Sequence, residues 1–138
     1  MAQSKRREKA QELVYNGCEV LDRSEPPSAR DLAVAEESFK RALAVEPELA
    51  DAYNGLGSIH YERGRYAEAE QMCRTALEKA RVELGTDDPD AFAWWGELST
   101  RPYMRARHTL GLILWRQGEY REAIGEFREM LRRNPRDN

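Results

Sequence analysis

The chain has 138 residues, of which 41% are hydrophobic and 34% are charged, and its formal net charge is -3. This length suits a single domain, residues 1–138. A slightly negative chain has no general attraction for nucleic acid or anionic membranes, and no apolar run approaches the length of a membrane span or signal peptide. We therefore expect a helical, cytoplasmic protein with neither a nucleic-acid nor a membrane partner.

The first third of the chain is predicted to form two helices joined by a loop. Residues 5–21 carry apolar residues at helical spacing, with Gly17 in their midst. A loop is expected around residues 24–29, where two prolines adjoin. Ser28 followed by Asp31 resembles a capping sequence, so a second helix is expected to run to about Val45.

Residues 51–80 form the most regular stretch and predict two further helices. One face of the first is formed by Tyr53, Leu56, Gly57 and His60. Gly64 is expected to end this helix, because glycine readily takes the left-handed conformation at a helix end. The second helix is expected from about Tyr66 to Leu84, with Gly85 as its stop.

The same register recurs before and after this stretch. Ala35, Phe39, Ala42 and Leu43 precede Ala69, Cys73, Ala76 and Leu77 by 34 residues each. Downstream, Gly57, Ala69, Cys73 and Leu77 correspond to Gly111, Ala123, Phe127 and Leu131, each displaced by 54 residues. A displacement of 54 equals one period of 34 plus an insertion of 20, and Pro47 and Pro135 keep the register.

This order of residues resembles the tetratricopeptide repeat, whose signature is W-x2-L-G-x2-Y, then A-x3-F, then P. Here it reads Tyr53, Leu56, Gly57, His60, Ala69 and Cys73, with Arg81 in the place of the proline. The resemblance implies an all-α solenoid of about three helix-turn-helix repeats. Their expected bounds are 5–47, 48–84 and 102–135, with the insertion at about 85–101. The run from Trp95 to Arg107 is also similar to a group of uncharacterised bacterial members, which adds no ligand or activity.

The resemblance implies that the first helices of the repeats line a concave surface that binds a protein or peptide partner. The groove residues we expect are Asn54, Ser58, Tyr61, Arg105, His108, Leu112 and Trp115; Gln11, Val14, Cys18 and Asp51 lie on the same predicted faces. For each of them a solvated helix face is the other interpretation. Some relatives hold acidic chaperone tails with a carboxylate clamp, but Val14, Cys18 and Gly55 stand where that clamp needs polar or basic groups.

The end of the chain suggests a second binding surface. Ile124, Phe127, Met130 and Leu131 follow Ala123 at helical spacing, with little chain after them. We therefore expect part of an apolar stripe to be uncovered, which predicts either self-association as a homodimer or a fragment whose next helix has been cut away.

No catalytic, cofactor or metal site is expected. His60 is interpreted as a core residue, and Asp87, Asp88 and Asp90 as a capping turn, because the order of an EF-hand loop is absent. Cys18 and Cys73 are expected to stay reduced. The leading function is a non-catalytic scaffold; the alternatives are an oligomerisation or regulatory module of a larger assembly, and a small enzyme.

Three expectations concern the insertion and the basic end of the chain. A short helix is predicted over residues 91–98. Of Trp94 and Trp95, one is expected to pack inward, while the other covers an end of the groove or meets a partner; a locally buried pair is the safer interpretation. Four arginines are interpreted as a solvated face because glutamates interleave them, namely Arg128, Arg132, Arg133 and Arg136.

Overall fold

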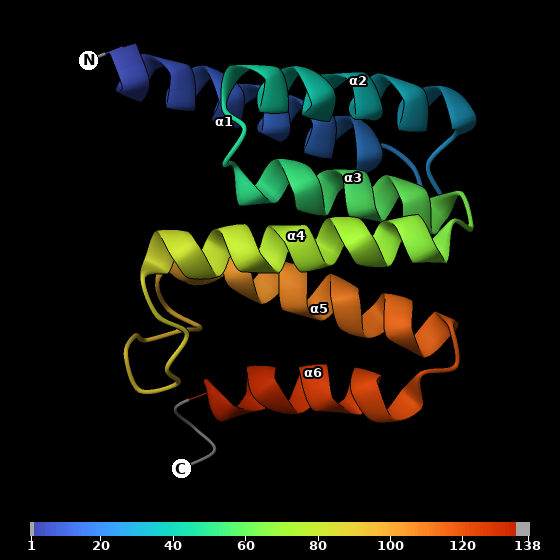
Figure 1. Cartoon of the computed structure of the whole chain (residues 1–138). Helices are drawn as coiled ribbons and strands as arrows, with labels where there is room; N and C mark the ends of the chain where they lie inside the picture. The colour runs from blue at the N-terminus through green and yellow to red at the C-terminus, as the bar shows by residue number, and fades with distance from the viewer. Residues whose placement is uncertain (1, 135–138) are drawn as a thin grey trace.

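The computed structural model describes residues 2–134 and contains three helix pairs stacked in chain order (Figure 1). The helices are α1 (Ala2–Leu21), α2 (Ala29–Val45), α3 (Ala50–Glu62), α4 (Tyr66–Leu84), α5 (Arg101–Arg116) and α6 (Tyr120–Arg132), with a short 3₁₀ helix η1 (Leu98–Thr100). The part of the chain that is described contains no strand, so the all-α prediction is confirmed. Pro135 and Arg136, on which two predictions bear, lie outside the described residues.

The helices end where the sequence indicates. The hydroxyl of Ser28 accepts a hydrogen bond from the backbone N–H of Asp31 at 3.1 Å, which caps α2 as predicted. Gly64, which follows α3, has a φ of 76°, and Gly118, 54 residues later, has a φ of 81°. A side chain is strained in this left-handed region, so both turns need glycine. Gly85 ends α4, also as predicted.

A close glycine contact recurs in each helix pair. A Cβ added at Gly17 would lie 2.8 Å from Phe39 of α2, and one at Gly57 would lie 2.6 Å from Sγ of Cys73. In the last pair, a Cβ at Gly111 would lie 2.7 Å from Phe127. No real Cβ tolerates such distances, so the first helix approaches the second closely because it lacks a side chain there. These glycines therefore bring the two helices of each pair together.

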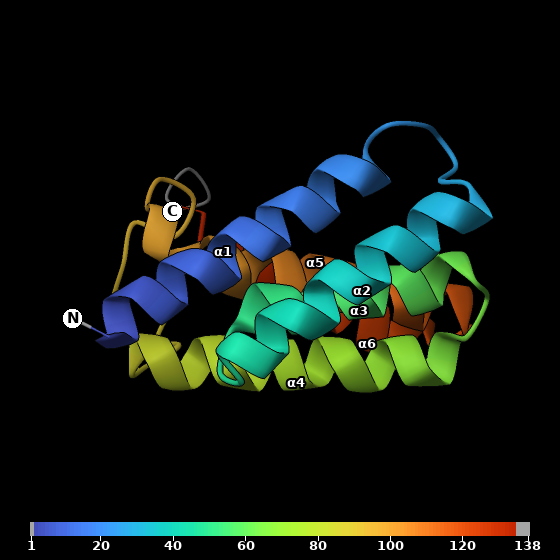
Figure 2. The ribbon, with the colours of Figure 1, turned by 90° about the horizontal axis from the view of Figure 1, so that it is seen from above.

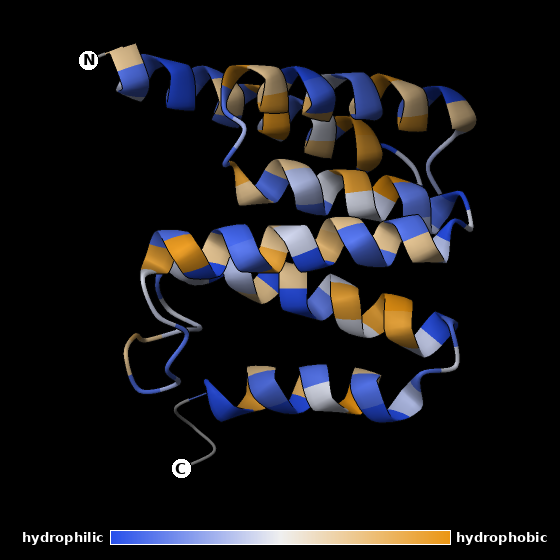
Figure 3. Cartoon of the chain, viewed as in Figure 1, coloured by the Kyte–Doolittle hydropathy of each residue, from blue (hydrophilic) through white to orange (hydrophobic). Residues whose placement is uncertain are grey.

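The helix pairs are rotated relative to one another. Figure 2 looks down the stack and shows α1 and α2 crossing α4 obliquely. Along each helix, apolar and polar residues alternate around the axis (Figure 3), as expected when one face packs on neighbours and the other meets water. Within residues 2–134, no helix is long and apolar enough to cross a membrane.

The insertion forms no α-helix over residues 91–98, so that prediction is wrong. The segment makes turns instead, and only the single turn of η1 follows. Trp94 is 1% exposed, and its ring packs 5.2 Å from that of Phe92 and 4.8 Å from that of Tyr103. The Thr100 hydroxyl donates to the Trp94 carbonyl at 2.6 Å. Burial of this one large side chain therefore overrides the local helix propensity.

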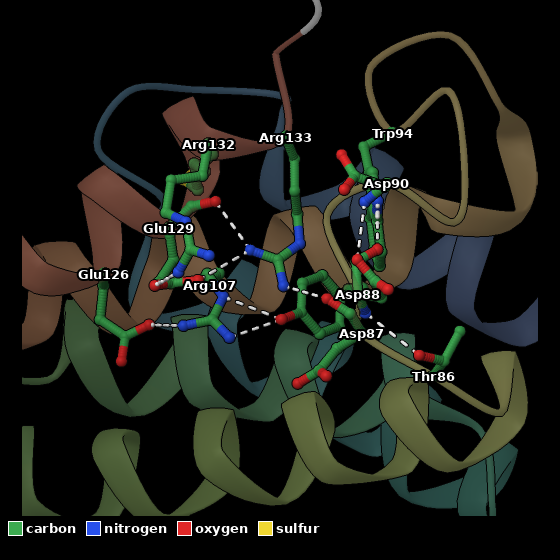
Figure 4. A network of polar contacts seen from close by, with 12 residues as sticks. Thr86, Asp87, Asp88, Asp90, Trp94, Arg107, Glu126, Glu129, Arg132 and Arg133 are labelled. Atoms are coloured by element: carbon green, nitrogen blue, oxygen red, sulfur yellow. Dashed lines mark hydrogen bonds and ion pairs between the residues drawn. The ribbon is translucent and has the colours of Figure 1, made fainter.

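Arg133 is buried, which corrects the interpretation of the terminal arginines as a solvated face. It is 4% exposed, and its guanidinium lies 4.8 Å from the ring centre of Trp94 and 5.1 Å from that of Tyr103. It donates to Glu129 at 3.0 Å and also to the carbonyl of Asp87 (Figure 4). The hydrogen bonds and the cation–π contacts fasten the insertion to the end of α6.

Trp95 behaves differently from its neighbour. It is 50% exposed, and its Nε1 donates to the carbonyl of Met130 at 3.2 Å. The expectation that one tryptophan packs inward is confirmed, whereas the interpretation as a buried pair is wrong. Trp95 of the insertion bonds α6, and Arg133 at the end of α6 bonds Asp87 at the start of the insertion. The insertion and the last helix therefore form one packed unit.

Candidate functional site

A groove of about 620 Å³ lies against α1, α3 and α5, the first helices of the three pairs. Its apolar lining comes from Val14, Tyr15, Leu21, Phe39, Leu49 and Gly55. Its polar lining comes from Gln11, Cys18, Asp22, Asp51, Asn54, Ser58 and Arg105. The groove thus combines an apolar floor with polar groups from three different helices.

Equivalent positions of the first helices meet in this groove. Arg105 follows Asp51 by 54 residues, the displacement that relates the last two pairs. Nη1 of Arg105 donates to Oδ2 of Asp51 at 2.9 Å, which joins α5 to α3. Burial raises the pKa of Asp51 above its ordinary value, although Arg105 opposes the shift and Glu83 adds to it.

Asn54 contacts the buried thiol of Cys73 as well as the groove. Sγ of Cys73 donates a weak bond to Oδ1 of Asn54 at 3.7 Å. The amide nitrogen of Asn54 and the side chains of Gln11 and Ser58 make no hydrogen bond with described residues. Three neutral polar groups therefore face the groove with hydrogen-bonding capacity left to satisfy.

The sequence predicted part of this lining. Asn54, Ser58 and Arg105 line the groove, and so do Gln11, Cys18 and Asp51 of the wider set. Val14 also lines it but is only 8% exposed and belongs to the core, so its assignment to a face that the core does not use is wrong. Six lining residues were missed, namely Tyr15, Leu21, Asp22, Phe39, Leu49 and Gly55. The signal for Asp22 was its position four residues after Cys18.

The other predicted groove residues lie outside the lining of this groove. The Tyr61 hydroxyl accepts a hydrogen bond from Nε of Arg116 at 3.0 Å. The Trp115 ring centre lies 4.8 Å from that of Tyr120, and the rings of His108 and Phe127 are 6.2 Å apart. Leu112 is 40% exposed.

Of the four residues predicted for self-association, two pack against other residues of the chain. Met130 is 9% exposed and packs in a cluster with Trp94 and Tyr103, so its expected place on an uncovered stripe is wrong. Phe127 is half-buried against Gly111. Ile124 and Leu131 remain 41% and 51% exposed.

The acidic residues of the insertion bond the backbone of their own segment. Oδ1 of Asp88 accepts from the backbone N–H of Asp90 at 2.9 Å, so the acidic run forms a turn as expected, but no helix begins there for this turn to cap. Within residues 2–134, no group of three His, Cys, Asp or Glu residues could hold a metal ion. Cys18 is an exposed free thiol and Cys73 a buried one. His60, interpreted as a core residue, is half-buried.

Two of the three helix pairs match models of a known protein family. Models described as tetratricopeptide repeat match residues 49–90 and 104–137. These ranges contain α3–α4 and α5–α6. The α1–α2 pair precedes both ranges but repeats the same glycine contact, through Gly17 and Phe39. A comparison with curated proteins found no match.

Proposed function

Because the chain belongs to the tetratricopeptide repeat proteins, whose repeats generally mediate protein–protein interaction, we propose that its groove binds a peptide segment of a protein partner. The observation that carries the proposal is the groove of about 620 Å³ that α1, α3 and α5 line together. A surface shared by three repeats can contact several successive residues of one segment.

The chemistry of the lining suits a peptide. A peptide backbone offers carbonyl oxygens and N–H groups at short intervals. The amide nitrogen of Asn54 can donate to such a carbonyl, and the groups of Gln11 and Ser58 can both donate and accept. Apolar side chains of the segment would meanwhile cover the floor around Val14 and Leu49, which removes apolar surface from water.

The proposed role is binding without catalysis, as is typical of scaffolds in this family. Although the residue Cys18 is exposed, the groups around its thiol partly desolvate it, which raises its pKa, and the charges of Asp51 and Asp22 act in the same direction. A nucleophilic cysteine needs the opposite shift. Asp51, the nearby carboxylate, is itself held by Arg105. These groups do not form an activated nucleophile and base.

A displayed library of random dodecamer peptides, selected against the full chain, tests the proposal. Selected peptides are then measured by fluorescence anisotropy against Ser58→Arg, which places a long cationic side chain in the groove. The matched control is Gln71→Arg, because Gln71 lies on α4 and lines a separate hollow of about 390 Å³. Circular dichroism checks that both variants fold.

We expect Ser58→Arg to weaken binding by about tenfold or more and Gln71→Arg to leave it within about twofold, since about 1.4 kcal/mol of lost contact gives a factor of ten. The proposal fails if no peptide is selected, if Ser58→Arg binds as the unchanged chain does, or if Gln71→Arg alone abolishes binding. The last result would assign binding to the outer hollow on α4.

The alternative function is an assembly module that joins copies of the chain through α6. It is favoured by the exposure of Ile124 and Leu131 on this helix. Sedimentation over a range of concentrations tests it, with Ile124→Glu and Leu131→Glu beside the unchanged chain. A concentration-dependent dimer that both substitutions dissociate supports self-assembly, and a monomer at all concentrations contradicts it.

A further inference from the structure

The charged groups of the groove are unequal in number. Asp22, Asp51 and Arg105 line it, and the guanidinium of Arg105 is already bound to Asp51 at 2.9 Å. The carboxylate of Asp22 makes no ion pair with any described residue. Glu83 of α4 also acts on Asp51 and is paired with Arg7 of α1. After these pairings, one carboxylate is left without a matching cation.

The charges that act on Cys18 show that both carboxylates reach the same part of the groove. It lies on α1 four residues before Asp22 and lines the same groove. Besides burial, Asp51 and Asp22 both raise the pKa of its thiol, while Arg105 lowers it. Both carboxylates therefore act on this point of the groove, and their combined effect opposes that of the single guanidinium. A cation placed beside Cys18 would be attracted.

Apolar side chains adjoin the same charges. Val14 and Leu21 lie on α1 on either side of Cys18 in the sequence, and Leu49 immediately precedes α3. An apolar side chain seated on them would displace water from the neighbourhood of Asp22, which strengthens an ion pair formed there.

We propose that the groove selects segments in which a lysine or arginine adjoins an apolar side chain. The apolar side chain packs on Val14, Leu21 and Leu49, and the cation binds the carboxylate of Asp22, with Asp51 as a second acidic neighbour. This inference rests on the proposed function, since it names the class of peptide that the same groove binds. It predicts the opposite charge preference from the carboxylate clamp, which takes acidic tails.

The ion pair between Arg105 and Asp51 supports a preference for basic over acidic peptides. A clamp for acidic tails needs cations that are free to meet a carboxylate. Among the described residues, Arg105 is the one cation in the lining, and its guanidinium is bound by Asp51. An acidic peptide would have to displace Asp51, whereas a basic one leaves this bridge intact and meets Asp22.

The test uses the peptides selected by the full chain and two analogues of each, in which every lysine and arginine is replaced by glutamine or by glutamate. Binding is measured by fluorescence anisotropy at low and high salt. The chain is compared with Asp22→Lys and with Glu37→Lys, which makes the same charge change at an exposed position of α2 that does not line the groove.

We expect the selected peptides to be enriched in basic residues beside apolar ones, and their glutamine analogues to bind about tenfold more weakly. Asp22→Lys should lose about tenfold in affinity for the basic peptides, and Glu37→Lys no more than about twofold. High salt should weaken binding of the basic peptides.

Two kinds of failure are distinguishable. If peptides bind and Ser58→Arg abolishes their binding, but the glutamine or glutamate analogues bind equally well, the charge preference is overturned and the groove remains the binding site. If no peptide is selected, or Ser58→Arg has no effect, the proposed function is overturned and the charge preference with it.

Discussion

The first two helix pairs place very different side chains at one equivalent position. In α2 the residue is Phe39, which is fully buried and is met by glycines of two helices, Gly17 of α1 and Gly55 of α3. In α4 it is Cys73, also fully buried, which is met by Gly57 of α3. The ring of Phe39, enclosed between two pairs, requires both neighbouring helices to give way, whereas the thiol of Cys73 requires one. The repeats therefore conserve the close approach while adjusting the volume on each side of it.

This difference also explains the position of the groove. Phe39 lines the groove together with Gly55, so the floor is formed where the ring takes the place of a side chain on α3. A Cβ at Gly55 would lie 2.5 Å from Cζ of Phe39. The packing of the first pair and the shape of the candidate binding site thus depend on the same contact.

The largest change in unfolding free energy is expected from Phe39→Ala, which removes the ring that distinguishes the first pair. Truncating a fully buried phenylalanine removes its transfer free energy and leaves a cavity, which costs about 3–5 kcal/mol of unfolding free energy. Urea denaturation followed by circular dichroism measures it. Tyr15→Ala is the control, because Tyr15 is 66% exposed and should change stability by less than about 0.5 kcal/mol. Equal effects of the two substitutions would contradict the role of Phe39.

The next effect comes from giving the second pair the side chain of the first. Sγ of Cys73 is already the atom nearest to a Cβ at Gly57, at 2.6 Å, and Asn54 packs on the same sulfur. Cys73→Phe should therefore overpack the pair and destabilise it by about 1–3 kcal/mol. Urea denaturation again measures the change. An unchanged or increased stability would show that α3 and α4 can separate to the spacing of α1 and α2.

A smaller effect is expected at the glycine that distinguishes the two pairs. In Gly55→Ala, the new Cβ meets the Phe39 ring, and the clash should outweigh the gain in helix propensity of about 1 kcal/mol, leaving a net loss of about 1 kcal/mol. Gly125→Ala is the matched control, because Gly125 lies within α6 and a Cβ there meets nothing within 4 Å. We expect that control to stabilise the chain by about 0.5–1 kcal/mol.

If Gly55→Ala and Gly125→Ala shift the urea midpoint in the same direction, the contact between Gly55 and Phe39 is not restrictive. The same variants can be tested with the selected peptides. Because Gly55 lines the groove, Gly55→Ala should also alter peptide binding, and Gly125→Ala should leave it unchanged.

Much of the fold could be predicted from local sequence. Ser28, Gly64 and Gly85 act at helix ends, and the repeat register identified Gly57 and Gly111, the glycines that meet Cys73 and Phe127. These signals are local or periodic, so they can be read without knowing how the chain folds back. The same holds for the alternation of apolar and polar residues that predicted the helices.

The features that the sequence did not indicate depend on contacts between distant segments. Arg133 is an ordinary surface residue by type, and its burial follows from Trp94 and Asp87, which lie 39 and 46 residues earlier. The groove lining was only partly predicted because periodicity shows which residues share a helix face but not how α1 is rotated on α3. Leu21 and Asp22, at the end of α1, reach the groove through that rotation.

The last prediction concerns how stability depends on pH. At the equivalent position only the second pair has an ionisable group, Cys73, whereas the first has Phe39. Burial raises the pKa of the Cys73 thiol from its ordinary value of 9.0 to about 12. Between these values the unfolded chain releases the proton and the folded chain keeps it, so stability falls as pH rises. The contribution is fully present below pH 9 and is lost between pH 9 and 12. At pH 10 the loss amounts to about 1 kcal/mol.

Urea denaturation at pH 8 and pH 10 measures this loss in the unchanged chain and in Cys73→Ala. Every other ionisable group is shared by the two proteins, so its contribution cancels in the comparison. Cys73→Ala should be less stable at pH 8, because it loses buried atoms, but it should lose about 1 kcal/mol less on going to pH 10. Parallel losses would mean that the thiol ionises as readily in the folded chain as in the unfolded one. In that case water must reach Cys73, and the close approach of α3 and α4 at Gly57 would not hold in solution.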